Sequence, residues 1–193
     1  MNHPYTLSVV AEPPRRKDAV FNREHIIGVA RELVDDGVPL QLNDVARRAG
    51  VGVATVYRHF PTTTALLEAV AAPCLEALIG YGEQALIAAD PGHAFGEFLS
   101  HVVEAQVTDA SLPPVNAAHA DELPYTTELK ARLRTVGSAL LDRAREAGAV
   151  RADLTDDDLI PLMCGIAYAA VAHPGPPAAR RYVEMLLTGL RTR

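Results

Sequence analysis

Apolar residues recur at helical spacing along most of the chain, and proline, glycine and threonine residues mark the ends of the helical stretches. Long amphipathic helices are predicted near residues 18–36, from residue 62 towards a break at 90–92, and at 93–108, 125–146 and beyond 177, and a helix that is apolar all round is predicted at 159–172. Pro73 is expected to kink or break the second of these near Ala69, because it removes an intrahelical hydrogen bond. With the short helices described next, the pattern predicts an all-α protein of about nine helices.

Residues 41–60 combine two short helical patterns with a forced turn. Gly50 stands where a C-terminal cap needs positive φ, and Val56 of the second helix can then pack on Val45 and Ala46 of the first. This arrangement predicts a helix-turn-helix suited to a DNA groove, and the alternative is an ordinary helical hairpin. The outward side of the second helix is expected to carry Gly52, Val53, Ala54, Thr55, Tyr57 and His59.

These residues resemble the TetR family of transcriptional regulators. The resemblance runs from about Asn22 to Leu67, and it depends on residues 44–46 (Asp-Val-Ala), 49–51 (Ala-Gly-Val) and 55–61 (Thr-Val-Tyr-Arg-His-Phe-Pro). The other two-thirds of the chain shares only a pattern of helices with the family. The resemblance implies a flexible arm (1–16), a three-helix DNA-binding domain (17–63) and a helical effector-binding and dimerisation domain (64–193).

The family resemblance also implies a function and a DNA-binding surface. We expect a homodimeric, cytoplasmic DNA-binding regulator, a repressor that a small-molecule effector releases from a palindromic operator. Thr55, Tyr57 and His59 match phosphate-contacting positions of the family, and Asn43 is the best remaining polar side chain. Gly52, Val53 and Ala54 match base-facing positions, where readout would be apolar contact and close backbone approach. Thr63 stands where family members commonly have a lysine.

The effector and dimer residues follow from position in the chain. The effector pocket is expected among the fourth to eighth helices, at residues that also suit a core: Leu78, Tyr81, Phe98, Val102, Tyr125, Met163 and Tyr168. The helix at 159–172 has no charged residue, so all its sides must be covered. A two-fold axis that doubles the last two helices would form a four-helix interface, whereas the alternative is a monomeric core. The expected interface residues are Leu162, Ile166, Ala169, Ala170, Tyr182, Met185, Leu186 and Leu190.

The net charge of -6 is divided unevenly along the chain. Residues 1–67 hold 8 Lys and Arg against 7 Asp and Glu, whereas residues 68–193 hold 10 against 17. A local basic patch can therefore meet DNA phosphate, while the acidic second part of the chain repels the duplex and so determines which end of the protein approaches DNA. An architectural DNA-binding protein without a ligand would need a basic body, so this alternative is disfavoured.

One polar stripe offers a second regulatory hypothesis. His93, Glu97, His101 and Glu104 share one side of a predicted helix, opposite Phe95. If the apolar side faces the core, the stripe faces water and forms weak pairs between neighbouring turns. The alternative is a metal-responsive regulator that binds a divalent cation through this stripe.

Motifs for catalysis are missing from the sequence. It has no G-x-S-x-G elbow, Walker loop or C-x-x-C pair, so we expect neither an enzyme nor a cofactor. Two cysteines, Cys74 and Cys164, cannot make a disulfide framework and indicate a cytoplasmic protein. No apolar run is expected to span a membrane. Basic residues 15–17 could reach the minor groove or backbone of DNA, or remain solvated.

Overall fold

The structure is a computed structural model that describes residues 16–172 and 178–190, and within them the chain forms nine α-helices and no strand. The all-α prediction is confirmed. Most of the predicted arm (residues 1–15) and the proline-rich break at 174–177 lie outside the described residues. The helices are α1 (Arg16–Asp35), α2 (Leu42–Ala49), α3 (Val53–His59), α4 (Thr63–Ala85), α5 (Pro91–Thr108), α6 (Leu112–Ala117), α7 (Pro124–Glu146), α8 (Asp156–Ala172) and α9 (Ala178–Leu190).

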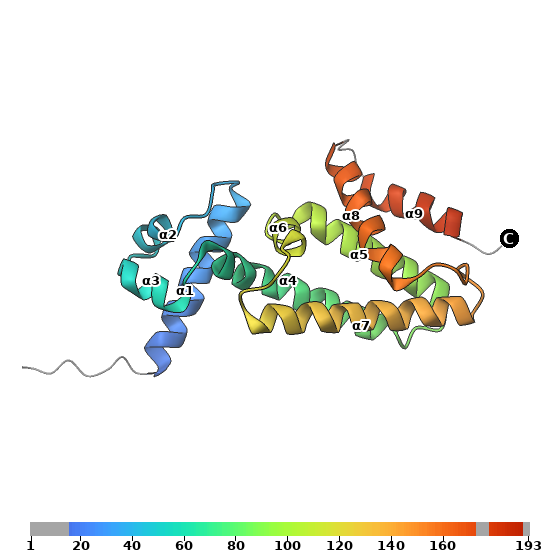
Figure 1. The fold of residues 1–193 in the computed structure, drawn as a ribbon, viewed down its shortest axis with the longest axis horizontal. Coiled ribbons are helices and arrows are strands. Elements are labelled where there is room, and N and C mark those ends of the chain that lie inside the picture. Colours follow the sequence, from blue (N-terminus) through green and yellow to red (C-terminus); the bar gives the residue numbers. More distant parts are fainter. Residues whose placement is uncertain (1–15, 173–177, 191–193) are drawn as a thin grey trace, which may run out of the picture.

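The nine helices form two groups that α4 joins (Figure 1). The first group contains α1, α2 and α3, which contact one another and the beginning of α4. The second contains α5 to α9, with α5 in contact with α4, α6, α7, α8 and α9. The chain therefore places a small three-helix unit at one end of an elongated helical body.

The first group has a core of its own. Ile26 and Leu33 of α1, Val45 of α2 and Val56 of α3 are fully or almost fully buried in one cluster. Leu66, Ala69 and Val70 of α4 belong to the same cluster. The three-helix unit therefore includes the first two turns of α4 in its hydrophobic core.

Helix α4 continues through the proline that was expected to kink or break it. Thr62 caps its N-terminus, because its side-chain oxygen accepts a hydrogen bond from Ala65 N at 3.0 Å. Pro73 lies inside the helix with its ring exposed, and α4 remains one continuous element to Ala85. Because proline has no backbone N–H, Ala69 O does not receive the intrahelical hydrogen bond that residue 73 would otherwise donate. The next carbonyl, Val70 O, accepts a hydrogen bond from Arg31 Nη2 at 2.6 Å.

By length and composition α4 could cross a membrane, contrary to the expectation from the sequence. Its most apolar window has a mean hydropathy of 1.4, and 56% of that window is buried inside the protein. The apolar side chains pack against α1, α5, α6 and α7. These properties are also those of a core helix, and the packing accounts for the composition of α4.

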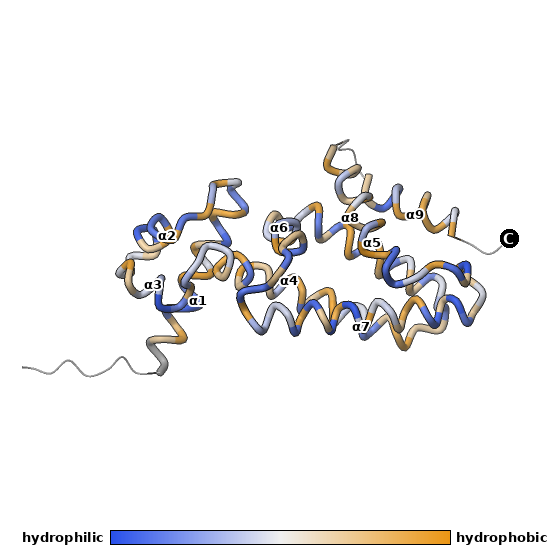
Figure 2. The backbone as a smooth tube through the Cα atoms, in the orientation of Figure 1, coloured by the Kyte–Doolittle hydropathy of each residue, from blue (hydrophilic) through white to orange (hydrophobic). Residues whose placement is uncertain are grey.

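The second group is built around α5, whose Phe95, Leu99 and Val103 are at most 2% exposed. Helix α7 packs along α4. Polar and apolar residues alternate along α7, as the colours of the tube show (Figure 2). Pro113 and Pro114, which follow α5 in the sequence, lie in the first turn of α6. Proline is tolerated there because the first amides of a helix have no intrahelical partner.

Close approach of α4 to α5 and α7 generates a prediction about two glycines of α4. A Cβ atom at Gly82 would collide with the side chain of Val136 and would lie 2.9 Å from Phe98 Cε2, whereas one at Gly80 meets nothing within 4 Å. We expect Gly82→Ala to lower the free energy of unfolding by about 1–3 kcal/mol through overpacking. Gly80→Ala should raise it by about 0.5–1 kcal/mol, because alanine favours the helix. Urea denaturation of both variants measures the difference, and equal effects would contradict the packing described here.

Candidate DNA-binding face and effector cavity

The turn between α2 and α3 has the geometry expected from its glycine. Gly50 has φ +63°, and the amide of Val51 donates a hydrogen bond to Ala46 O at 3.1 Å. Val56 is fully buried in the same cluster as Val45 and Ala46. The turn and this contact fix the angle between the two helices, so the predicted helix-turn-helix is present.

The outward face of α3 carries most of the residues expected to meet DNA. Gly52 and Ala54 are exposed, and Val53 and Tyr57 are 46% and 47% exposed. Thr55 and His59 are partly buried instead. Burial, with the nearby charges of Arg23 and Arg58, lowers the pKa of His59 below its ordinary value. At neutral pH His59 can therefore offer a hydrogen bond but no positive charge.

A surface hollow of about 320 Å³ brings the remaining expected DNA contacts together. Asn43 at the start of α2, Tyr57 of α3 and Thr63 of α4 all line it. No side chain caps the N-terminus of α2, so its first amides are free to meet an anion. The hydroxyl of Thr62, by contrast, is occupied by Ala65 N and by Glu122. The hollow therefore has the donors that a DNA phosphate requires.

Two basic residues on this unit were not singled out from the sequence. Arg48 of α2 and Arg58 of α3 are exposed, and neither has an ion pair among the described residues. Arg47, in contrast, pairs with Asp44 at 2.8 Å. The sequence could have indicated both, because each is a basic residue in the last turn of a short helix, a pattern typical of a nucleic-acid-binding surface.

A partly buried polar joint connects α1 to the α5–α6 junction. Arg31 Nη1 and Nη2 donate to Asp109 Oδ1 and Oδ2 at 2.8 and 3.1 Å, and Asp109 also accepts from the amide and hydroxyl of Ser111. Burial opposes ionisation of Asp109, but the hydrogen bonds from Arg31 and Ser111 outweigh it and hold its pKa below the ordinary value. The bidentate pair thus fixes the DNA-binding unit against the second group.

A second joint connects α4 to the start of α7. The carboxylate of Glu68, which is 1% exposed, accepts hydrogen bonds from the amides of Glu122 and Leu123, both at 2.8 Å. Leu123 is the N-cap residue of α7, where a negative charge is favourable. Glu68 was the lone acid within an apolar stretch of the sequence, which is the signal that could have identified it.

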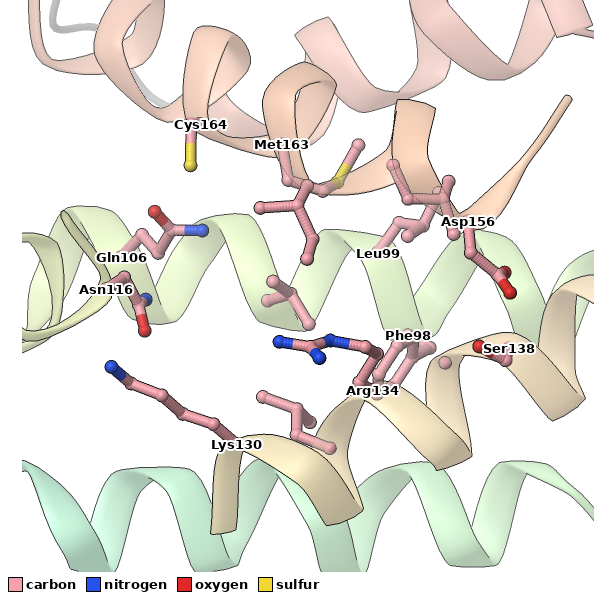
Figure 3. A pocket seen from close by; sticks show the side chains of 15 residues that line it. Phe98, Leu99, Gln106, Asn116, Lys130, Arg134, Ser138, Asp156, Met163 and Cys164 are labelled. Atoms are coloured by element: carbon pink, nitrogen blue, oxygen red, sulfur yellow. The ribbon is translucent and has the colours of Figure 1, made fainter. Parts of the chain in front are cut away.

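The second group contains a mainly apolar cavity of about 190 Å³, bounded by α5, α6, α7 and α8 (Figure 3). Of the residues expected to bind an effector, Phe98, Val102 and Met163 line it. The other four do not: Leu78 is buried, Tyr81 packs on His101, Tyr125 donates to Glu76, and Tyr168 is 78% exposed. Polar side chains that line the cavity, and that the sequence did not single out, include Gln106, Asn116, Lys130, Arg134, Ser138 and Asp156.

The His/Glu stripe of α5 is only partly solvated: His93 is exposed, whereas the other three residues lie beside α9 or Tyr81 and are partly buried. Arg180 of α9 pairs with Glu97 at 3.3 Å and with Glu104 at 3.6 Å. The His101 ring lies 3.8 Å from the Tyr81 ring, and His101 Nδ1 is 4.0 Å from Glu104, too far for a hydrogen bond. Among residues 16–172 and 178–190, no three potential ligands are grouped to hold a metal ion. The metal-responsive alternative has no support from this geometry.

Helix α8 leaves an apolar stripe exposed on the outside of the protomer. Ile160, Cys164, Tyr168 and Val171 recur on one side of it, and the first two of these also line the mouth of the cavity. Met185 of α9 is 64% exposed. Of the expected dimer residues, Ala170 and Leu190 are buried within the protomer and are not available to a partner. Leu162, Ile166, Ala169, Tyr182 and Leu186 are partly buried.

Comparison with known proteins places this architecture in a defined class of bacterial regulator. A family profile described as bacterial regulatory proteins of the tetR family matches residues 26–70, and one described as the C-terminal domain of SbtR-like transcriptional regulators matches residues 90–192. The two matches correspond to the helix-turn-helix unit and to the helices around the cavity. Together they define a helix-turn-helix regulator of transcription. The chain belongs to the TetR family, whose members are non-enzymatic DNA-binding regulators.

Individual relatives agree with this assignment. The HTH-type transcriptional regulator SAR0097 of Staphylococcus aureus (strain MRSA252) is 36% identical over 59 residues, which span 29% of this chain and 31% of that protein. A TetR regulatory protein from Mycobacterium vanbaalenii is 30% identical, with a TM-score of 0.56 over 93% of this chain and 100% of the other. RolR, solved with resorcinol, is 20% identical with a TM-score of 0.66 over 91% of this chain and 90% of its own, so it shows the fold alone.

The joint between α1 and the α5–α6 junction generates a prediction about stability and pH. In a double-mutant cycle, we expect Arg31→Met and Asp109→Asn to show a coupling energy of about 1–3 kcal/mol at neutral pH, because the pair is bidentate and mostly buried. The folded-state pKa of Asp109 is lowered, so this stabilisation is present above the unfolded pKa of about 3.9 and is lost as pH falls through the folded value. Chemical denaturation at a series of pH values measures both effects.

The exposed pair of Arg47 and Asp44, at the same 2.8 Å separation, is the matched control. Its side chains are 75% and 36% exposed, and its cycle should give roughly 0–1 kcal/mol. A coupling at Arg31 and Asp109 no larger than that of the control would refute the role of the joint.

Proposed function

We propose that this protein is a homodimeric repressor that binds a palindromic operator in the cytoplasm and is released by a small molecule bound in the cavity between α5, α6, α7 and α8. One observation carries the proposal: the DNA-binding unit is tied by buried charges to the helices that border an apolar cavity. A cavity of this kind is the usual form of a small-molecule site. RolR, which has the same fold, is known with resorcinol bound, and the fold can therefore hold a small molecule.

The proposed DNA contacts fall into two kinds. Tyr57, Thr63 and Asn43 around the hollow would meet phosphate, with Thr55 and His59 beside them. Gly52, Val53 and Ala54 would lie against base edges, where a small backbone surface allows close approach and apolar contact with thymine methyl groups. Arg48 and Arg58 add unpaired positive charge to the same unit.

The proposed homodimer interface uses the exposed stripe of α8 together with Met185. An apolar face of this extent is costly to leave in water, and a two-fold axis beside it would bury it against its own copy. The partly buried residues Leu162, Ile166, Ala169, Tyr182 and Leu186 would lie at the edge of that interface.

A contiguous route supports communication between cavity and DNA. Lys130, which lines the cavity, donates to Val115 O of α6 at 2.8 Å. Helix α6 follows directly after Ser111, which donates to Asp109, the partner of Arg31. An effector that displaced Lys130 would shift α6 and change the position of α1 relative to its partner copy.

Selection of bound sequences from random DNA tests the class and the symmetry together. We expect a palindromic site whose half-sites are about one helical turn or more apart, as two copies of the reading helix require. Recovery of non-palindromic sequences only, or of none, would reject the proposed homodimeric repressor.

The phosphate role of Tyr57 predicts a uniform loss of affinity. Tyr57→Phe removes one hydrogen bond to the backbone and no base contact, so binding to operator and unrelated DNA should weaken alike, by about 1 kcal/mol or more. Fluorescence anisotropy with both DNAs measures this. Tyr125→Phe, which removes a hydroxyl from the start of α7, is the control and should change neither affinity. Unchanged binding by Tyr57→Phe would remove this residue from the interface.

The missing lysine at the start of α4 predicts a change in salt dependence. Thr63→Lys should tighten binding to operator and unrelated DNA and steepen the slope of log K against log salt by roughly 1 per half-site, because lysine releases a condensed counterion. The helix dipole opposes a cation there by about 0.3–1 kcal/mol, which proximity to phosphate should outweigh. Thr135 is an exposed residue of α7, away from the hollow, so Thr135→Lys adds the same charge elsewhere and serves as the control. Equal slopes for both variants would show that residue 63 does not approach the backbone.

A further inference from the structure

Two cations lie on the side of α7 that faces the cavity. Lys130 and Arg134 are four residues apart and therefore lie on the same side of α7. The cavity is lined on this side of α7 also by Leu133, Gly137 and Ser138. Other basic residues of α7 pair outside the cavity, as Arg132 does with Glu83 at 2.9 Å. Like charges on adjacent turns disfavour the helix, so this arrangement calls for compensating negative charge.

Only one of the two cations is compensated. Lys130 contacts the carboxylate of Asp121 and donates to Val115 O at 2.8 Å, and its side chain is 19% exposed. Arg134, which is exposed to solvent at the rim of the cavity, has no hydrogen bond or ion pair within the part of the chain that the structure describes. Figure 3 shows its guanidinium directed across the cavity towards the end that holds Lys130, with Asp156 at the opposite end.

The cavity as a whole has a charged end and an apolar end. Gln106 and Asn116 lie with Lys130 near α6, and their amides can donate hydrogen bonds. Phe98, Leu99 and Met163 form much of the remaining wall. A volume of about 190 Å³ is somewhat larger than the engineered cavity of about 150 Å³ that holds benzene. The space therefore suits one ring or a short chain with an anionic head.

We infer that the effector is a small monocarboxylic acid with an apolar aromatic or aliphatic body. This inference rests on the proposed function and names the chemistry of its effector. The carboxylate lies between Arg134 and Lys130, where arginine offers a planar pair of donors that matches two carboxylate oxygens. The apolar body lies against Phe98, Leu99 and Met163. By competing with Asp121 and Val115 O for Lys130, the same carboxylate loosens the hold of α7 on α6.

The test uses pairs of probes that differ in charge and not in size. Isothermal titration calorimetry of the full-length protein compares 4-ethylbenzoate with 4-ethylbenzamide, and octanoate with octanamide. We expect at least one acid to bind about tenfold or more tightly than its amide, as a charged hydrogen-bonded pair predicts. The inference would be overturned if in neither pair the acid bound more tightly than its amide, and also if none of the four probes bound at millimolar concentration.

Variants of α7 locate the effect. Arg134→Gln should lower the affinity for the acid about tenfold and leave that for the amide unchanged, whereas Arg134→Lys should retain part of the preference. Arg132→Gln, on the same helix but paired with Glu83, is the matched control and should bind the acid as the wild type does. Equal losses in Arg134→Gln and Arg132→Gln would overturn the assigned role of Arg134.

The outcome is separable from that of the proposed function. The selection of bound DNA sequences tests the proposed homodimeric repressor without any small-molecule probe, and calorimetry tests the preference for the acid without DNA. A palindromic operator combined with no acid preference would reject the carboxylate alone. Acid binding that is lost in Arg134→Gln, without a palindromic operator, would reject the homodimeric repressor and leave the carboxylate site in place.

Discussion

Helix α4 belongs to two hydrophobic cores at once, and the other helices are arranged around that constraint. Leu66 and Val70 are buried with α1, α2 and α3, whereas Leu75 and Ile79 are buried with α6 and α7. Because close-packed cores resist continuous deformation, a displacement at one end of such a helix must be taken up at the other. Because α4 is continuous through Pro73, the two cores share one helix.

Charged side chains add specificity to this shared helix. Glu68 is a buried polar group and the Arg31–Asp109 pair is partly buried, and each has hydrogen-bonding partners on the opposite side of the junction between the two groups of helices. Burying charge is costly unless it is paired, so these contacts are satisfied in one arrangement of the DNA-binding unit and broken in others. An apolar junction would allow a range of orientations. The polar joints thus select a defined position of the reading helix relative to the cavity.

The unpaired arginines of the helix-turn-helix and the exposed apolar stripe of α8 lie on different parts of the protein surface. Unpaired Arg48 and Arg58 lie on the small DNA-binding unit, although the whole chain carries a net charge of -6. The exposed apolar stripe lies on α8, within the second group of helices and away from that unit (Figure 1). This distribution of charge and apolar surface agrees with the proposed arrangement, in which the three-helix unit meets DNA and α8 meets a second copy.

The sequence by itself determined the helices and the helix-turn-helix, because helical periodicity, Gly50 and Thr62 act through local geometry. Tertiary structure alone decided which side of each helix is covered. The His/Glu stripe of α5 was expected to face water, but α9 brings Arg180 against Glu97 and Glu104. Tyr168 fitted an effector pocket by pattern and lies outside it, while Arg134, an exposed arginine that the pattern assigns to solvent, lines the cavity. Periodicity shows that a helix has distinct sides, but the partner of each side depends on contacts between residues far apart in the chain, as between Arg31 and Asp109.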